Sequence, residues 1–367
     1  MNYLNKVVLS KKALLHNIFL LQSLDNSKQI FLNLKSNAYG HGIEEITLIL
    51  KDSKQASLVV VNSIEEAQLV SKLNIKQEVL VTGYVLPSNL INITSNIKFA
   101  VWSIKQCKEI LGKLPKAKLH LFIDSGMNRE GIKFVELKKD IVKYKQFISN
   151  IEGILSHFSS ADEPKSLENA KQIEIYNSCI KYLEDNGFNF KYKHLSASSG
   201  HIRGLTKYIC DSSRIGLSLY GINPLTKSKL KLTPVLSLYS TLIQFKDITK
   251  GEKIGYNATY TASQDMTIGI LPIGYADGIP RELSNIGYVK YKDKSCKYVG
   301  RISMNLCAID ISEVKSPKVG DSICIISNNT KDLNSVTNIA NLTKKIPYQI
   351  LVGINSNIKR LIKRSLS

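Results

Sequence analysis

Residues 29–35 read QIFLNLK, a short apolar run that ends in a lysine. Seven similar runs follow before residue 217, and a longer amphipathic stretch separates each run from the next. They are SLVVVN (57–62), EVLVTG (78–83), IKFAVWS (97–103), KLHLFID (118–124), IEGILSHF (151–158), KYKHLSAS (191–198) and CDSSRIG (210–216). Eight strand-then-helix units predict an N-terminal (β/α)8 TIM-like barrel, with a doubly wound open sheet as the alternative.

The segments between these runs carry helix-start signals. In NSIEEAQLVSKL (62–73), Asn62 or Ser63 precedes Glu65 and Glu66, which gives an N-cap followed by an acidic first turn. This arrangement favours helices between the predicted strands.

After about residue 228 the pattern changes to short alternating runs separated by Gly, Asp and Lys turns. Such a pattern is typical of a mainly β domain. We therefore expect a barrel over residues 1–228 and a C-terminal mainly β domain over residues 229–367. Within the second domain, the tail from residue 336 is expected to be helical and then irregular. The run NKVVLS (5–10) precedes the barrel and is a candidate to pair with the β domain.

The chain carries 50 Lys plus Arg against 30 Asp plus Glu, a net charge of +20. The excess is mostly lysine without a long basic run, so we expect it to attract anionic small molecules and predict no nucleic-acid partner. The absence of a long apolar run and of a signal-peptide pattern predicts no membrane association. Six scattered cysteines without a CxxC pair predict reduced thiols, no metal site and a cytoplasmic protein.

Polar residues that can carry chemistry follow the ends of the predicted strands. In (β/α)8 barrels the active site lies at the carboxyl ends of the strands. The residues in such positions are Lys35, Asp124, Arg129, His157, Ser198 and Arg214. Lys35 leaves an apolar strand, and burial lowers the pKa of a lysine so that its amine can condense with an aldehyde cofactor.

Seven motifs, in order along the chain, are similar to those of bacterial alanine racemases. They are SNAYGHG (36–42), DSGMNREGI (124–132), HFSSADE (157–163), RIGLSLYG (214–221), GYNATYTA (255–262), LPIGYADG (271–278) and GRISMN (300–305). The resemblance covers nearly the whole chain and implies a barrel followed by a C-terminal β domain. It also implies pyridoxal 5'-phosphate (PLP) as cofactor and the racemisation of L-alanine to D-alanine, which supplies D-alanine for peptidoglycan.

The resemblance assigns the residues of a PLP site. Lys35 would hold PLP covalently and act as one catalytic base, and Tyr39 would contact the cofactor phosphate. The backbone N–H groups of Ser198, Gly216 and Leu217 would cradle that phosphate, and a glycine lets the backbone approach closely.

The same resemblance assigns the proton-transfer residues. Arg214 would face the pyridine nitrogen, and His157 would hydrogen-bond Arg214 or tune this network. Because an arginine donates a hydrogen bond and keeps its proton, PLP would be a weaker electron sink and side reactions would be limited. Tyr256 would be the second base, on the face of the substrate Cα opposite Lys35, and would come from the partner subunit of a homodimer.

Four further residues are implied around the substrate. Arg129 and the backbone N–H of Met304, the latter from the partner chain, would bind the substrate carboxylate. Tyr275 and Arg281 would line the entrance.

Several positions depart from the family pattern. Phe122 stands where a carbamylated lysine that orients the arginine is common, and Ala197 replaces an asparagine beside the phosphate. Asn305 replaces an aspartate, and the tail tyrosine that contacts phosphate would fall at Ser356, with Asn357 where arginine is typical. Each lost hydrogen bond is worth about 0.5–1.5 kcal/mol, so we expect weaker retention of PLP in a preserved site.

Other functions stay open at this point. A racemase of serine or of a broader amino-acid range is compatible with the changed entrance. A PLP decarboxylase with the same two domains is disfavoured by Arg214, because that chemistry benefits from a protonated pyridine. A non-enzymatic PLP-binding protein would lack the β domain, and a nucleic-acid binder is supported by the net charge alone.

Overall fold

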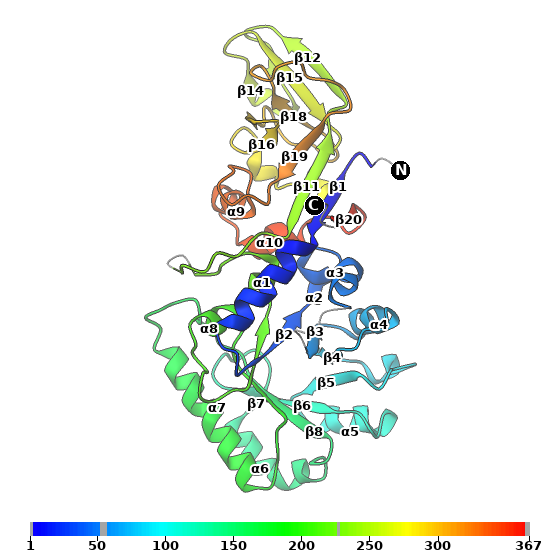
Figure 1. Ribbon diagram of the computed structural model, residues 1–367, viewed down its shortest axis with the longest axis vertical. Helices are drawn as coiled ribbons and strands as arrows, with labels where there is room; N and C mark the ends of the chain where they lie inside the picture. Colours follow the sequence, from blue (N-terminus) through cyan, green and yellow to red (C-terminus); the bar gives the residue numbers. More distant parts are fainter. Residues whose placement is uncertain (1–2, 52–56, 226–227, 364–367) are drawn as a thin grey trace.

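The computed structural model describes residues 3–51, 57–225 and 228–363. Figure 1 shows an elongated molecule, with a part built of strands and helices at one end and a strand-rich part at the other. The N-terminal strand and the last strand lie where the two parts meet (Figure 1).

The first part is a closed barrel of eight parallel strands. The strands follow the order β5-β4-β3-β2-β10-β9-β8-β6, and pairing of β5 with β6 closes the ring. The strands are β2 (Gln29–Asn33), β3 (Leu58–Val61), β4 (Glu78–Val81), β5 (Ile97–Val101), β6 (Leu119–Asp124), β8 (Ile151–Leu155), β9 (Tyr192–His194) and β10 (Ser212–Ile215). Each coincides with one of the eight predicted runs, so the barrel is confirmed and the open sheet is excluded.

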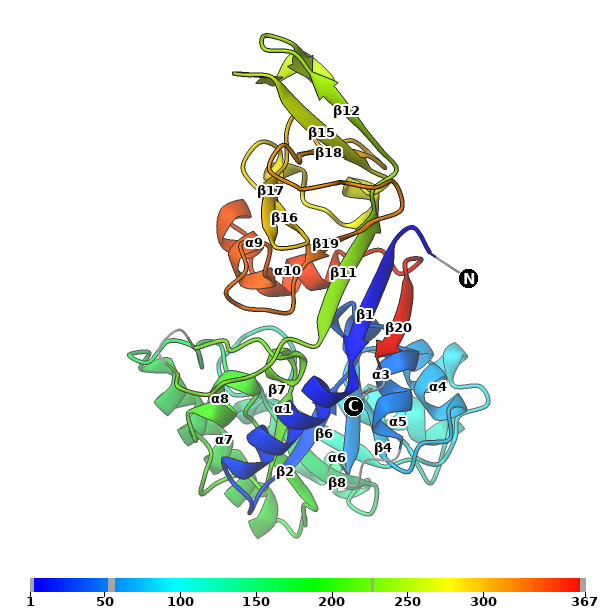
Figure 2. The same ribbon diagram turned by 45° about the horizontal axis from the view of Figure 1, so that its top comes forward.

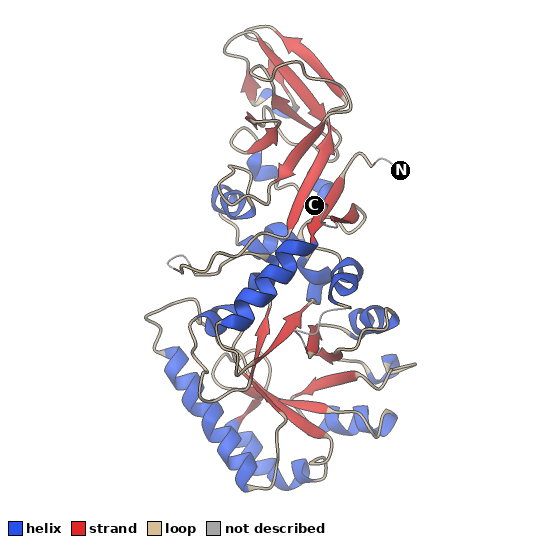
Figure 3. Cartoon of the chain, in the orientation of Figure 1, coloured by secondary structure: helices blue, strands red, loops and turns tan. Residues whose placement is uncertain are grey.

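One helix precedes the first barrel strand, and further helices alternate with the strands along the chain (Figure 3). They are α1 (Lys11–Ser23), α2 (Lys35–Tyr39), α3 (Ile43–Leu50), α4 (Ile64–Lys72), α5 (Ile104–Lys113), α6 (Phe134–Lys145), α7 (Glu168–Asp185) and α8 (Ser198–Ile202). Shorter elements in this part are β7 (Ile132–Lys133), η1 (Pro87–Asn89) and η2 (Leu217–Tyr220). Of the two N-cap candidates of α4, Ser63 is the cap, because its Oγ accepts a hydrogen bond from the Glu66 N–H at 3.3 Å.

The second part is mainly β, as predicted. Its strands are β11 (Leu236–Thr241), β12 (Gln244–Ile248), β13 (Lys253–Ile254), β14 (Tyr260–Thr261), β15 (Met266–Leu271), β16 (Tyr288–Tyr291), β17 (Lys294–Lys297), β18 (Cys307–Asp310) and β19 (Ser322–Ile326). Short 3-10 turns are η3 (Tyr256–Ala258), η4 (Tyr275–Asp277) and η5 (Arg281–Leu283). The strands form a six-stranded, a three-stranded and a two-stranded sheet.

Both ends of the chain complete the six-stranded sheet. Strand β1 (Lys6–Ser10) pairs antiparallel with β11 and parallel with β20 (Lys359–Lys363), so the expected partnership of the first run with the β domain is confirmed (Figure 2). In the tail, α9 (Val336–Thr343) and α10 (Pro347–Val352) are helical as predicted. The expectation of an irregular end is wrong, because β20 finds its backbone partners on β1.

One hydrophobic cluster extends from the barrel into the β domain, which anchors the two parts to each other. All six cysteines are free thiols, and five of them are buried. None of the helices in the described ranges has the length and apolar character needed to cross a membrane.

Candidate active site

Lys35 lies at the mouth of the barrel, two residues after the end of β2. It lines a cavity of about 320 Å³ together with Arg129, Glu130, His157 and Arg214. Burial, followed by the positive charges of Arg129 and Arg214, lowers the pKa of Lys35 below its usual range. A larger fraction of free amine at neutral pH is the property that the sequence predicts for this lysine.

The turn that follows Lys35 is left-handed. Four successive non-glycine residues, from Ser36 to Tyr39, have φ between 52° and 55°. A left-handed turn of L-residues costs about 1–2 kcal/mol per residue, so tertiary contacts must hold it. The side-chain oxygen of Asn37 accepts from the Ile43 N–H at 2.8 Å, and the Asn37 N–H donates to Glu66 Oε1 at 3.1 Å.

The C-terminal tail fixes the other end of this turn. The buried guanidinium of Arg360 in β20 donates from Nη2 to the carbonyl oxygen of Gly40 at 3.0 Å. A Cβ at Gly40 would lie 2.0 Å from the carbonyl oxygen of Leu351 in α10, so the backbones of the turn and the tail are in close contact. The segment carrying Lys35 is therefore clamped between the barrel and the tail.

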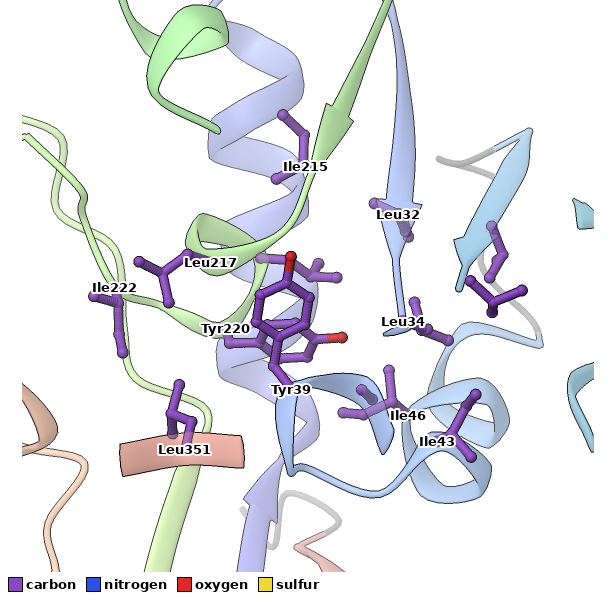
Figure 4. Close-up of a cluster of buried hydrophobic side chains, with 14 of the residues drawn as sticks. Leu32, Leu34, Tyr39, Ile43, Ile46, Ile215, Leu217, Tyr220, Ile222 and Leu351 are labelled. Carbon is purple, nitrogen blue, oxygen red and sulfur yellow. The ribbon is translucent and has the colours of Figure 1, made fainter. Parts of the chain in front are cut away.

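Tyr39 is buried at the end of the turn, within the apolar cluster of Figure 4 that also contains Leu217 and Leu351. Its ring lies 5.1 Å from that of Tyr220 and 5.9 Å from that of Tyr348 in α10, measured between centroids. Tyr348 thus approaches Tyr39 from the tail, whereas Ser356 stands where the family resemblance places the phosphate-contacting tyrosine.

The segments after β9 and β10 bring the predicted phosphate residues together. Ser198 Oγ accepts from the backbone N–H of Gly216 at 3.1 Å and of Ser218 at 3.3 Å. A Cβ at Gly216 would lie 2.2 Å from the hydroxyl oxygen of Tyr39, so only a glycine fits against this phenol. The hydroxyl of Ser218 is buried and has no hydrogen-bond partner among the described residues. Convergent N–H and O–H donors of this kind suit an anion such as phosphate.

Arg214 is buried in the barrel mouth, where every contact is with an acceptor. It donates to the carbonyl oxygens of Ser156, His194 and Leu195 at 2.5, 2.6 and 3.3 Å. It also donates to Nδ1 of His194 at 2.9 Å and to Nδ1 of His157 at 3.1 Å. Because a guanidinium only donates, both histidines accept at Nδ1 and are neutral there. Burial lowers the pKa of Arg214 to about 10, which leaves it cationic at neutral pH.

A chain of polar side chains continues from Arg214 through the barrel interior. His194 Nε2 and His120 Nδ1 are 2.8 Å apart, and His120 Nε2 lies 3.6 Å from Glu152 Oε1. Glu152 also pairs with Lys98, whose Nζ lies 2.9 Å from Glu78. Burial raises the pKa of Glu152, but hydrogen bonds from His120 and Lys98 outweigh it and lower that pKa to about 2. The sequence gives one local sign of this network, since each of these polar side chains lies within or beside an apolar run.

Four of the predicted site residues lie on the other domain. Tyr256 is in η3, between β13 and β14, and 67 % of its surface is exposed. Tyr275 and Met304 lie together, since the N–H groups of Tyr275 and of its neighbour Ala276 donate to the carbonyl oxygens of Ser303 and Met304, both at 3.0 Å. Arg281 is exposed in η5.

Within the described part of one chain, none of these four residues lines the Lys35 cavity. Figure 1 shows β14 in the distal domain, well separated from α2. One copy of the chain therefore does not bring Tyr256 and Lys35 together.

The structure shows what surrounds the residues that depart from the family pattern. Phe122 is buried in an apolar cluster with Ala100, Leu155 and Trp102. Arg129 instead makes a two-point ion pair with Glu130, a residue that no sequence motif singles out. Ala197 precedes α8, Asn305 is exposed, and Asn357 donates its N–H to the Asn355 side chain.

Comparisons with known proteins agree with this arrangement. Residues 9–224 match the family model of the alanine racemase N-terminal domain, and residues 235–362 match that of the C-terminal domain. An alanine racemase of Borreliella burgdorferi (strain ZS7) is 32% identical, covering 98% of this chain and 99% of its own length. One of Clostridium perfringens (strain SM101) is 31% identical, covering 94% and 92%.

Solved structures give the same result. An alanine racemase of Clostridium difficile 630 matches with a TM-score of 0.91 and 27% identity, covering 99% of this chain and 96% of that one. The Bacillus anthracis alanine racemase with bound L-Ala-P matches with a TM-score of 0.89 and 26% identity, again over 99% and 96%. Both the sequence and the fold match over nearly the full length, and the chain belongs to the alanine racemase family.

Proposed function

We propose that this protein is a PLP-dependent alanine racemase that interconverts L- and D-alanine. The observation that carries the proposal is the amine of Lys35, with its lowered pKa, in one cavity with the Arg214 guanidinium. Family membership supports the same reaction. In a bacterial cell this activity would supply D-alanine for peptidoglycan from the cytoplasm.

The residues around the cavity fit PLP. Lys35 would hold the cofactor covalently, and Arg214 would donate a hydrogen bond to its pyridine nitrogen without giving up a proton. Tyr39, Ser198, Gly216 and Leu217 would receive the phosphate, as the N–H donors around Ser198 Oγ and the unpartnered Ser218 hydroxyl support. When bound, PLP supplies an electron sink that acidifies the Cα–H bond of the amino acid.

Two bases are needed, one on each face of the substrate Cα, to remove a proton and return one with inverted configuration. Lys35 Nζ is the base on the barrel side, since burial and the nearby guanidinium groups lower its pKa and so raise the fraction of free amine. Tyr256 Oη is the base on the other side. Because Tyr256 is exposed and lies on the distal domain, it would reach the cavity of a second copy, which makes the active form a homodimer.

The substrate carboxylate would bind Arg129 of one subunit and the backbone N–H of Met304 of the other. Tyr275 and Arg281 would line the entrance, and Tyr275 is held against the Met304 segment by backbone hydrogen bonds. His157 would act through Arg214, with which it shares a hydrogen bond. Burial, then the charges of Arg214, Arg129 and Lys35, lower the pKa of His157 to about 3, so it would stay neutral.

The direct test is to reconstitute the purified protein with PLP and to follow the interconversion of L- and D-alanine. We expect turnover in both directions, a pyridoxyl label on Lys35 after borohydride reduction, and loss of turnover in Lys35→Ala and Tyr256→Phe. Tyr208→Phe, at an exposed tyrosine of the barrel, is the matched control and should keep wild-type turnover. Full activity in both site variants would refute the two-base assignment.

A racemase of serine or of a broader amino-acid range is the second candidate. The exposed Asn305 next to Met304 is compatible with it, because this residue replaces a charged aspartate of the family pattern at the entrance. Comparison of kcat/KM for alanine and serine decides between the two, and a higher value for serine would favour this alternative.

A further inference from the structure

Arg129 and Glu130 form a two-point ion pair at the rim of the Lys35 cavity. The guanidinium Nε pairs with Glu130 Oε2, and Nη2 donates to Oε1 at 2.8 Å. Both side chains line the cavity that contains Lys35. A bidentate contact of this type fixes the plane of the guanidinium as well as its position.

The side chains of β6 that could hold the Arg129 guanidinium are either apolar or already hydrogen-bonded elsewhere. Phe122 in β6 is buried among apolar side chains and offers no acceptor. The carboxylate of Asp124, at the end of β6, accepts from the N–H groups of Gly126 and Asn128, both at 3.0 Å, and so shapes the loop. Glu130 is left as the carboxylate that holds Arg129.

We infer that Glu130 is a positioning residue for substrate binding, holding Arg129 so that the free edge of its guanidinium receives the amino-acid carboxylate. This inference rests on the proposed function. With Nε and one Nη2 hydrogen engaged by Glu130, the Nη1 side of the fork keeps the N–H groups needed for a second carboxylate. Glu130, the next residue in the sequence, thereby does for Arg129 what an acidic group at position 122 would do in the family pattern.

Glu130 also balances the charge of the cavity. Lys35, Arg129 and Arg214 contribute three cationic groups, and Glu130 is the only carboxylate among the described residues that line the cavity. Burial, Arg129 and Arg214 lower the pKa of Lys35, whereas Glu130 and Glu66 raise it. Removal of the Glu130 charge should therefore lower the pKa of Lys35 further.

The kinetic test uses the enzyme reconstituted with PLP. Glu130→Gln removes the charge and one of the two contacts, and Glu130→Asp keeps the charge but shortens the reach. The ion pair is partly exposed, since 54% of the Arg129 side chain and 29% of the Glu130 side chain are accessible. Such pairs are worth up to about 1 kcal/mol, so Glu130→Gln should raise the KM for L-alanine by about three- to fivefold, with a smaller change in kcat. Glu130→Asp should recover part of the loss. Glu174→Gln, with the same charge change at an exposed position of α7, should leave KM unchanged.

A second readout does not depend on racemisation. Labelling of Lys35 by an amine-reactive reagent, followed by mass spectrometry across pH, gives the titration midpoint of its amine before PLP is added. Glu130→Gln should move this midpoint to lower pH, and Glu174→Gln should leave it in place.

The outcomes separate the inference from the proposed function. If the wild-type enzyme racemises alanine and Glu130→Gln keeps its KM, the positioning role is overturned and the racemase stands. If the wild type racemises no amino acid, the proposed function fails, and the labelling midpoint still decides whether Glu130 and Lys35 are coupled. An unchanged midpoint in Glu130→Gln would overturn that coupling.

Discussion

At the scale of single residues, the predicted phosphate site is shaped by close contacts between backbone and side chains. Gly216 is the clearest case, because its missing side chain leaves the space that the Tyr39 hydroxyl fills. Ser198 bridges two backbone N–H groups beside it. A phosphate site built from backbone donors requires this kind of approach.

Gly216→Ala should weaken PLP binding. The new Cβ would lie 2.2 Å from the Tyr39 hydroxyl oxygen, so that phenol would have to move. Overpacking of a close-packed site costs about 1–3 kcal/mol, and we expect the Kd for PLP, measured by absorbance titration, to rise about tenfold. Gly112→Ala is the control, since a Cβ there meets nothing within 4 Å. Equal PLP affinity in both variants would contradict this view of the site.

The sequence identifies Lys35, His157 and Arg214 because each ends a barrel strand, and the topology brings strand ends together. It does not reveal Glu130, because adjacent opposite charges meet only if the loop turns their side chains to the same side. It also does not reveal Tyr348, which approaches Tyr39 from the far end of the chain. Contacts of this kind depend on tertiary structure and leave no local pattern.

At the scale of elements, the tail acts as a brace for the catalytic turn. Arg360 donates to the carbonyl oxygens of five residues. Four of them lie in the tail between residues 354 and 358, and the bond to Gly40 ties β20 to the segment after Lys35. The left-handed turn needs such support because its backbone conformation is unfavourable. The expectation of an irregular tail was wrong because the strand partner of β20 is β1, which lies at the opposite end of the sequence.

Arg360→Met should loosen this brace. The buried carbonyl oxygens would lose their donor, and each unsatisfied group costs about 1–3 kcal/mol, so we expect a loss of about 3 kcal/mol or more in urea unfolding. PLP affinity should fall as well, because the turn that carries Lys35 is released. Lys359→Met, at the exposed neighbouring position of β20, should change neither quantity. Wild-type stability in Arg360→Met would show that the tail is dispensable.

At the scale of the whole molecule, buried histidines make stability depend on pH. Burial is the main cause that lowers the pKa of His41 to about 4 and of His157 to about 3, and it also lowers those of His120, His194 and His201. Each side chain takes up a proton near pH 6.5 when unfolded, but only at lower pH in the folded protein.

Acid should therefore destabilise the protein before its carboxylates titrate. The unfolded chain binds more protons below pH 6.5, so the free energy of unfolding should fall as pH drops from 6.5 toward 4.5. Each histidine contributes up to about 1.4 kcal/mol per pH unit. Urea unfolding at pH 7.5, 6.0 and 5.0 measures this, and His157→Gln should flatten the slope. A free energy of unfolding that is constant over this range would contradict the neutral, buried state of these histidines.

The two domains also place the proposed bases apart within one chain. Lys35 lies in the barrel, whereas Tyr256, Met304 and Tyr275 are exposed on the β domain. The barrel and the β domain follow from the sequence pattern, because each has its own hydrophobic period. No hydrophobic pattern indicates that a second copy of the chain completes the Lys35 cavity. Only the family resemblance pointed to this arrangement.

A mixed dimer tests this shared site most directly. Lys35→Ala and Tyr256→Phe subunits are each inactive alone, and they are unfolded, refolded together in equal amounts and assayed with PLP. Random pairing makes half of the dimers mixed, and each mixed dimer has one intact site of two, so about a quarter of wild-type activity should return. If mixed dimers form and no activity returns, Lys35 and Tyr256 do not act across the subunit interface and the central claim is wrong.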